Sequence, residues 1–337
     1  MSDRLVDAYD LVIFDLDGVI YLIDKPIPGA VEAVSRLRSG GTTVAYATNN
    51  ASRRAADVAT LLSGMGVPAA PDEVLTSAAA AAAMLADDLP AGAPVLVVGA
   101  EALRAEIRDV GLVPVSRLDE SPVAVVQGYG PEVGWKDLAE ACLAVRAGAR
   151  WIATNTDRTL PSPRGPLPGN GSLVAVLRTA LGREPDVVVG KPEPALFTTA
   201  ASRTGAGKAL VVGDRLDTDI EGAVRAGMDS LLVLTGVSGP AEMLSAPVER
   251  RPTHVAADLA GLFAADVDTR VGSGSGDVAE GWRLVREGSV VELDGAGAAV
   301  HALRLLVGAV WDGADIAQVR GRSSEARHVL QGWGLPG

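Results

Sequence analysis

The sequence has few features that would place the protein in a membrane or in an oxidising compartment. It contains one cysteine, Cys142, which cannot form an internal disulfide and is predicted to fill the apolar side of a helix. No apolar run approaches the roughly 18 residues that a membrane span needs. The chain start also lacks the cationic stretch and apolar segment typical of a signal peptide. We therefore expect a soluble, cytoplasmic protein with no membrane partner.

An excess of positive charge is also absent. The chain has 30 Lys and Arg residues against 42 Asp and Glu residues, and the net charge of −12 argues against a nucleic-acid partner. Aromatic residues make up only 4% of the chain, whereas hydrophobic residues reach 48% and are mostly small and aliphatic, which suits helices that cover a parallel sheet. A length of 337 residues predicts about two domains.

One stretch, residues 11–19, ends an apolar run in two acids and a glycine. The apolar residues 11–14 are typical of a parallel strand that is buried on both faces. Asp15 and Asp17 follow at a spacing that puts both on one side of an extended chain. Like charges at the end of a buried strand are costly unless a cation or a proton lies between them, which favours a hard metal ion. An ordinary turn explains the same residues, and this segment alone leaves both interpretations open.

Strands and helices alternate along most of the chain, which predicts an α/β fold with a parallel sheet. Residues 77–85 are predicted to begin a helix capped by Ser77. Residues 158–172 carry four prolines and three glycines and are predicted to form a loop without helix or strand. The further predicted strands are residues 42–47, 94–98, 123–126, 151–154, 186–189, 208–213 and 230–234, and the further predicted helices are residues 30–40, 135–146 and 195–204.

Functional side chains follow four of the predicted strands. They are Asp15 and Asp17, Thr48, Lys191 and Asp214. Ligands of open parallel sheets bind beyond the carboxyl ends of the strands, so we expect a site there. Thr48 with the backbone amides that follow it forms a natural oxyanion cradle before a helix, although Asn50 or Ser52 would serve equally well as a helix N-cap.

A new alternation of strands and helices starts within the chain, and the first one continues after it, which predicts an inserted domain. We expect residues 1–80 and 183–263 to form the core and residues 81–182 to form a second, small α/β unit. Residues 264–276 end in Gly-Ser-Gly-Ser-Gly and are predicted to be a flexible linker. Residues 277–337 are predicted to form a short α+β appendage that is too small for an independent core, so it docks on the main body or on another subunit.

In their order and spacing, these segments resemble the haloacid dehalogenase superfamily of phosphotransferases. The resemblance rests on residues 15–18, 48–50, 191–192 and 213–219. The insertion between the second and third of these segments is similar to the large α/β cap of type C2, a branch with 4-nitrophenyl, phosphoglycolate, glycerol-3-phosphate and pyridoxal phosphate phosphatases and nucleotidases. The resemblance implies a Rossmann-like core with a parallel sheet and a phosphatase activity.

The resemblance also implies a role for each matching residue. Asp15 is the nucleophile that becomes an aspartyl-phosphate, and Asp17 is the general acid and base. The cofactor is Mg²⁺, held by the Asp15 side chain, the backbone carbonyl of Asp17 and Asp214, while Asp219 orients metal-bound water. Phosphoryl oxygens are held by Thr48, by the amides around Asn49 and Asn50, and by Lys191.

The substrate implied by the large cap is a small phosphate monoester rather than a phosphoprotein. The cap loop is expected to select it, through Asn155, Asp157, Arg158, Thr159 and Leu160. Because relatives that prefer pyridoxal phosphate carry aromatic or imidazole side chains in this loop and this chain does not, glycerol 3-phosphate and phosphoglycolate are the favoured substrates.

Two other classes of function stay open. Nucleotides or pyridoxal phosphate are alternative substrates, and a non-catalytic scaffold on the same fold is an alternative function. Residues 318–323 also resemble, faintly, the pyrophosphate loop of N-acetyltransferases, although a random match or a degenerate remnant explains them better. A homo-oligomer stays open as well.

Overall fold

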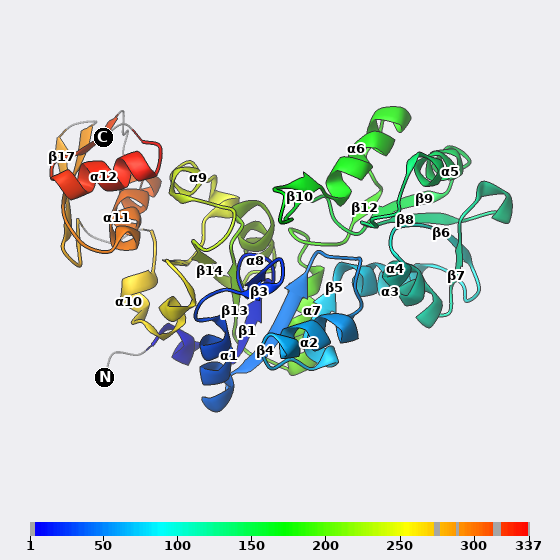
Figure 1. The fold of residues 1–337 in the computed structure, drawn as a ribbon, viewed down its shortest axis with the longest axis horizontal. Helices are drawn as coiled ribbons and strands as arrows, with labels where there is room; N and C mark the ends of the chain where they lie inside the picture. The colour runs from blue at the N-terminus through cyan, green and yellow to red at the C-terminus, as the bar shows by residue number, and fades with distance from the viewer. Residues whose placement is uncertain (1–3, 273–276, 288–289, 313–317, 336–337) are drawn as a thin grey trace. The chain divides into compact units, whose positions relative to one another are not determined.

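The computed structural model describes residues 4–272, 277–287, 290–312 and 318–335 (Figure 1). The chain forms two compact units. The first comprises Met1–Ile20, Ile27–Val44 and Gly205–Gly337, and the second comprises Tyr21–Pro26 and Ala45–Thr204. The predicted domain borders after residues 80 and 182 do not coincide with the limits of these units and remain a prediction.

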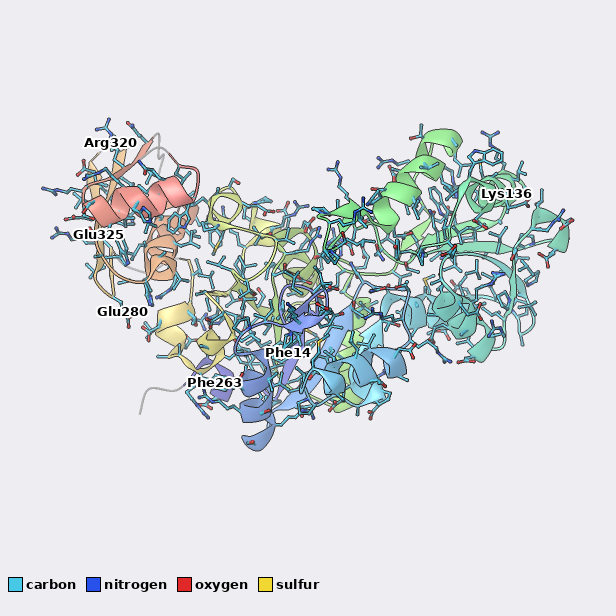
Figure 2. All side chains as sticks on the ribbon, viewed as in Figure 1. Phe14, Lys136, Phe263, Glu280, Arg320 and Glu325 are labelled. Carbon is cyan, nitrogen blue, oxygen red and sulfur yellow. The ribbon has the colours of Figure 1, made fainter. Side chains whose placement is uncertain are left out.

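The first unit contains four parallel strands in the order β15-β14-β13-β1. All residues of β1 and β13 are buried, as their uninterrupted apolar sequences predict. Phe14, the last residue of β1 (labelled in Figure 2), lies opposite Val212, so both strands end at the same level of the sheet. The strands are β1 (Leu11–Phe14), β13 (Ala209–Gly213), β14 (Asp229–Val233) and β15 (His254–Ala256).

Short helices accompany this sheet. The longest of them, α1, buries residues at positions i, i+3, i+4 and i+7, which is the periodicity of an amphipathic helix. The helices of this part of the chain are η1 (Leu5–Ala8), α1 (Ala30–Ser39), η4 (Leu216–Ile220, a π-helix), α8 (Glu221–Arg225), α9 (Pro240–Leu244), η5 (Val248–Arg250), η6 (Leu259–Phe263) and α10 (Asp266–Thr269). The segment 264–272 therefore holds a helical turn, with Thr269 buried, where a flexible linker was predicted; residues 273–276 lie outside the described residues.

A polar cluster is buried at the amino-terminal end of this sheet. His254 is fully buried, with Nδ1 3.1 Å from the Thr269 hydroxyl and Nε2 3.7 Å from the Asp266 carboxylate. The Tyr9 hydroxyl donates to Asp229 at 2.9 Å. Burial and the nearby cation Arg270 lower the pKa of His254 to about 4. His254 is therefore neutral at physiological pH.

The appendage folds into a small sheet with two helices and its own apolar core. Trp282, Leu293 and Leu330 lie in that core, whereas Leu303 and Val307 on α11 pack with residues of β14 and β15. Of the two docking partners that the sequence left open, the main body accounts for the contacts of Leu303 and Val307, and the apolar core of the appendage itself was not expected. Its elements are β16 (Val278–Ala279), β17 (Trp282–Glu287), β18 (Val290–Gly295), α11 (Ala299–Trp311), β19 (Gln318–Gly321) and α12 (Ser324–Gly332).

The second unit contains a five-stranded parallel sheet in the order β12-β9-β8-β6-β7. Helices α3 and α4 cover one face and α5 and α6 cover the other (Figure 1). Alternate residues of β6 explain these two layers, because Val95 and Val97 face α3 and α4, whereas Leu96 and Val98 face α5 and α6.

Two further strands of the second unit, β4 and β5, pair in parallel, with Tyr46 opposite Val74. The elements of this part of the chain are β2 (Tyr21–Leu22), β3 (Lys25–Pro26), β4 (Thr43–Thr48, which starts in the first unit), α2 (Ala55–Gly64), η2 (Pro71–Glu73), β5 (Val74–Thr76), α3 (Ser77–Asp88), β6 (Pro94–Val98), α4 (Glu101–Asp109), β7 (Val113–Val115), η3 (Leu118–Glu120), β8 (Ala124–Gln127), α5 (Trp135–Arg146), β9 (Arg150–Ala153), β10 (Thr159–Leu160), β11 (Leu167–Pro168), α6 (Asn170–Leu181), β12 (Val187–Val188) and α7 (Ala195–Thr204).

Three local predictions were wrong. Residues 158–172 contain the antiparallel pair β10–β11 and the start of α6, because prolines are tolerated in such short edge strands. Helix α3 is capped by Thr76, whose hydroxyl accepts from the Ala79 amide, rather than by Ser77. Cys142 is only half-buried on α5. Within the described ranges, none of the helices has the length and apolar character to traverse a bilayer.

Candidate active site

Three aspartates gather at the carboxyl end of the sheet in the first unit. Asp15, Asp214 and Asp219 are buried, and each offers a carboxylate oxygen within 4.8 Å of the others. The Asp15 amide donates to the Val212 carbonyl at 2.8 Å, which extends the pairing of β1 with β13 and places Asp15 beside the end of β13. Strand pairing therefore brings together acids that lie about 200 positions apart in the sequence.

Asp219 reaches the cluster from the π-helical turn η4. Its carboxylate accepts from the Arg215 amide at 3.1 Å. A Cβ atom on Gly213 would lie 2.2 Å from the Asp219 Cβ, so only glycine allows this close approach at the end of β13. Asp217 instead forms an ion pair with the Arg215 guanidinium at 2.9 Å, which accounts for its absence from the cluster.

This donor set fits a hard divalent cation. Three buried carboxylates repel one another at such short separations, and oxygen-binding cations such as Mg²⁺ relieve that repulsion. The carboxylate group found among the described residues does not include Asp17, although the sequence places Asp17 two residues after Asp15. The role of Asp17, which was expected to give a metal only its backbone carbonyl, remains a prediction.

The residues predicted to hold phosphate lie in the second unit. Thr48 is the last residue of β4, and its hydroxyl accepts from the Asn50 amide at 3.1 Å. The Asn50 side chain accepts from the Ser52 amide at 2.8 Å and from the Ser52 hydroxyl at 2.7 Å. Asn50 thus forms an Asx-type turn after the strand, while helix α2 begins only at Ala55.

Asn49 clamps the backbone of Lys191. Its side-chain oxygen accepts from the Lys191 amide at 2.8 Å, and its side-chain nitrogen donates to the Lys191 carbonyl at 3.0 Å. The Lys191 ammonium group is buried and donates to the Ala47 carbonyl at 3.1 Å. These contacts fix the position of the buried Lys191 cation. They use the side chain of Asn49, whereas the sequence predicted a role only for its backbone amide.

Two of the five predicted cap-loop residues join this network. The Asn155 amide group donates to the Asn49 carbonyl at 2.6 Å, and the Asp157 carboxylate accepts from the Asn49 side chain at 3.1 Å. Arg158 and Thr159 have exposed side chains, and Leu160 is half-buried in the β10–β11 hairpin. The structure therefore brings Asn155 and Asp157 to Asn49 and Lys191, and it does not do so for the other three.

Sequence reasoning missed two residues that hold this network. Ser77 is fully buried, and its hydroxyl donates to the Asn49 carbonyl at 2.7 Å. Asn170, at the start of α6, donates to the Asn155 carbonyl at 2.7 Å. An isolated serine before an alanine run and an asparagine between two glycines were the available signals, but both are also typical of helix caps.

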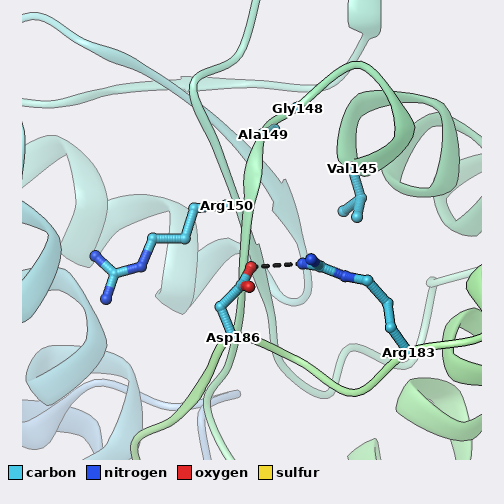
Figure 3. Close-up of a pocket in the computed structure, with 6 residues that line it drawn as sticks. All are labelled: Val145, Gly148, Ala149, Arg150, Arg183 and Asp186. Atoms are coloured by element: carbon cyan, nitrogen blue, oxygen red, sulfur yellow. Dashed lines mark hydrogen bonds and ion pairs between the residues drawn. The ribbon is translucent and has the colours of Figure 1, made fainter.

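A shallow pocket of about 300 Å³ lies elsewhere in the second unit (Figure 3). Arg183 forms an ion pair with Asp186 at 2.6 Å, whereas the Arg150 side chain extends away from that pair (Figure 3). Arg150 is the first residue of β9, so the pocket lies at the amino-terminal edge of the sheet, opposite the end where Asn155 follows β9. Ligands of parallel sheets bind at the other edge, and this pocket is not the active site.

Family comparisons agree with this arrangement. The family model described as haloacid dehalogenase-like hydrolase matches residues 12–113, and a second, HAD-hydrolase-like model matches residues 188–262. The first match contains Asp15 and Thr48, and the second contains Lys191 and Asp214. The chain belongs to the haloacid dehalogenase-like hydrolase family, as its sequence segments predicted.

The similar proteins narrow the class further. The chain is 46% identical to a D-glycerol 3-phosphate phosphatase of Mycobacterium tuberculosis, over 98% of this chain and 96% of that protein. The crystal structure of a glycerol phosphate phosphatase from the same organism in complex with magnesium has a TM-score of 0.91 and 44% identity and covers 99% of this chain and 100% of the other.

A more distant solved structure, a 4-nitrophenylphosphatase from Thermotoga maritima, has a TM-score of 0.71 and 32% identity and covers 77% of this chain and 98% of its own. These relatives are phosphatases, and this chain is a phosphoric monoester hydrolase. The predicted 4-nitrophenylphosphatase-like branch is confirmed.

Proposed function

We propose that this protein is a magnesium-dependent phosphatase whose substrate is glycerol 3-phosphate. The observation that carries the proposal is the buried cluster of Asp15, Asp214 and Asp219, a donor set suited to a hard cation at the end of a parallel sheet. The substrate assignment is supported by the name of the M. tuberculosis relative, because the match extends over nearly the whole of both chains.

The metal would be held by the carboxylates of Asp15 and Asp214 and by the backbone carbonyl of Asp17, with Asp219 orienting bound water. When bound, Mg²⁺ supplies the positive charge that lets an anionic carboxylate approach an anionic phosphate. All three carboxylates of the cluster are at most 8% exposed, so bulk water screens that charge little.

The reaction proceeds in two displacements. A carboxylate oxygen of Asp15 forms a bond to phosphorus while the bond from phosphorus to the glycerol oxygen breaks, and Asp17 gives that oxygen its proton. Asp17 then removes a proton from water, whose oxygen attacks the aspartyl-phosphate, releases inorganic phosphate and restores Asp15. Asp17 suits both steps because its carboxyl group is not assigned to the metal.

Phosphoryl oxygens are assigned to Thr48 and to the Lys191 ammonium group. Lys191 is only 2% exposed, so its charge acts in surroundings of low dielectric constant. The clamp by Asn49 supports this role, since a cation that stabilises a transition state must already be in place when the charge develops. The absence of an aromatic ring at positions 158–160 favours a small, flexible substrate over a ring-bearing one.

A kinetic screen tests the proposal. Phosphate release from glycerol 3-phosphate, phosphoglycolate, pyridoxal phosphate and a nucleoside monophosphate is compared with Mg²⁺ present, after chelation by EDTA, and after Mg²⁺ is restored. We expect glycerol 3-phosphate to give the highest kcat/KM, and we expect chelation to abolish turnover reversibly. A higher kcat/KM for any other member of the panel would overturn the substrate assignment. Turnover that survives chelation would overturn the proposed dependence on a metal.

A further inference from the structure

The loop at residues 235–238, which follows β14, surrounds Asp214. The Val237 amide donates to the Asp214 carboxylate at 2.7 Å, and the Ser238 amide donates to the Asp214 backbone carbonyl at 2.9 Å. The Ser238 hydroxyl in turn accepts from the Leu216 amide at 3.0 Å. Both the side chain and the backbone of Asp214 are therefore held by one short segment that carries no acid, base or cation.

Two glycines form a slot for the Asp214 carboxylate. A Cβ atom on Gly236 would lie 1.8 Å from Oδ2 of Asp214, and a Cβ atom on Gly18 would lie 2.5 Å from the same oxygen. Gly18 also has a φ of +83°, which favours glycine independently. The backbone of Gly236 has no such requirement, because its φ lies outside the left-handed region. An alanine at position 236 would thus be excluded by the carboxylate alone.

Thr235 closes the slot. Its hydroxyl donates to the Gly18 carbonyl at 2.6 Å and so connects the loop after β14 to the turn that follows Asp17. This hydrogen bond fixes the two glycines that lie against the carboxylate relative to each other. A carboxylate held in such a slot by an N–H group cannot rotate without losing the hydrogen bond, so its orientation is set before a metal binds.

We infer that residues 235–238 are a positioning segment that orients Asp214 and thereby sets the affinity of the site for a divalent cation. This inference rests on the proposed assignment of Asp214 as a metal ligand. The segment acts through Asp214, which it holds by its backbone amides. Supporting groups of this kind typically change metal affinity by about 10–100-fold when they are lost.

The variant Gly236→Ala tests the inference most directly. To accommodate the new methyl group, the loop or the carboxylate must move by about 1 Å. A displacement of that size can lower the reaction rate of a well-oriented site by about 100-fold. The matched control is Gly239→Ala, because a Cβ atom on Gly239 meets nothing within 4 Å and its φ of −111° suits alanine. Binding of Mn²⁺ and of Mg²⁺ to the full-length protein is measured by calorimetry without substrate.

We expect Gly236→Ala to raise the Kd for both ions by about 10–100-fold and Gly239→Ala to leave it within about two-fold of the parent value. At saturating Mg²⁺ a large part of kcat returns, because the ion restores the ligand geometry. An unchanged Kd in Gly236→Ala would overturn the inference. An increase in Kd in Gly239→Ala as large as that in Gly236→Ala would overturn it as well.

A second pair of variants covers the case in which Gly236→Ala fails to fold. Thr235→Val removes the hydrogen bond to Gly18 and keeps the shape of the side chain, whereas Thr235→Ser keeps the hydroxyl. Weaker Mn²⁺ binding in the valine variant, restored in the serine variant, supports the inference, and equal binding in both overturns it. A parent protein that binds neither ion would instead refute the proposed metal-dependent function, and the inference would fall with it.

Discussion

The clamp between Asn49 and Lys191 predicts that Asn49→Asp is far more damaging than its nearly identical shape suggests. The substitution retains an oxygen to accept from the Lys191 amide. It replaces the donor that faces the Lys191 carbonyl at 3.0 Å and the Asp157 carboxylate at 3.1 Å by a second acceptor. Asn49 is 7% exposed, so water cannot fully replace the lost hydrogen bonds.

Two effects set the size of the expected loss in stability. A buried carbonyl that loses its donor costs about 1–3 kcal/mol. Two carboxylates about 3 Å apart repel by about 5 kcal/mol at an effective dielectric constant of 20, and we take roughly half of this because Asp157 is half-buried and one of the groups can take up a proton. We therefore expect a loss of about 3–6 kcal/mol in the free energy of unfolding, measured by urea denaturation at pH 7.

The catalytic consequence follows from the same geometry. A shift of Lys191 by about 1 Å would lower kcat by about 100-fold. The matched control is the double variant Asn49→Asp with Asp157→Asn, in which the amide at position 157 can donate to the new carboxylate. It should recover the part of the stability that charge repulsion removed, but not the hydrogen bond to the Lys191 carbonyl. If the free energy of unfolding of Asn49→Asp lies within about 0.5 kcal/mol of the parent value and its kcat is unchanged, the clamp contributes neither to stability nor to catalysis.

Three further predictions concern other parts of the molecule. Asp15→Asn should lower phosphate release by at least about 1000-fold while the melting temperature stays near the parent value; turnover close to the parent rate would exclude Asp15 as the nucleophile. The pKa of His254, about 4 in the folded protein against about 6.5 when unfolded, makes the unfolded state the better proton acceptor, so stability falls as pH drops from 6.5 to 4, by about 3 kcal/mol. Urea unfolding of His254→Gln should lack this component of the pH dependence, and an equal slope in both proteins would contradict it. Arg304 of α11 is 6% exposed and donates to the backbone carbonyls of Arg270 at 3.1 Å and of Val267, so Arg304→Ala should lower the unfolding free energy by about 2–4 kcal/mol. Its kcat/KM should stay within about two-fold, and a selective loss of activity would give the appendage a catalytic role.

The longer elements were predictable because their local signals are strong. The strand residues 94–98 and the helix residues 135–146 match β6 and α5 at both ends. Among the strands that were missed, β5, β7 and β15 have only three residues each, which is too short for periodicity to distinguish them from loop. The hairpin β10–β11 was missed because prolines normally indicate loop, and only its pairing partner shows that the segment is a strand.

The tail illustrates how a short sequence match can have a structural cause. Residues 318–323 resembled a pyrophosphate-binding loop, but the Ser323 hydroxyl accepts from the Ala326 amide and caps α12. A Cβ atom on Gly321 would lie 2.5 Å from the Arg327 amide nitrogen, so close packing onto the following helix explains this glycine. A strand, a glycine and a helix cap account for the pattern without a ligand.

Residues that perform chemistry and residues that hold them in place differ in how far sequence reveals them. An acid directly after a buried strand is costly unless a turn exposes it to water, so Asp15 and Asp214 stand out in the sequence as candidates, and the polar residues at the other strand ends favour a function over a turn. Gly236 and Asn49 give no such signal in the sequence, because a glycine suits any turn and an asparagine suits any helix cap. Their roles arise only when folding places an Asp214 oxygen where a Cβ atom of residue 236 would be, and the Lys191 backbone against an asparagine side chain. A single sequence can therefore predict the reacting groups of such a site, whereas the segment that orients them becomes visible only in three dimensions.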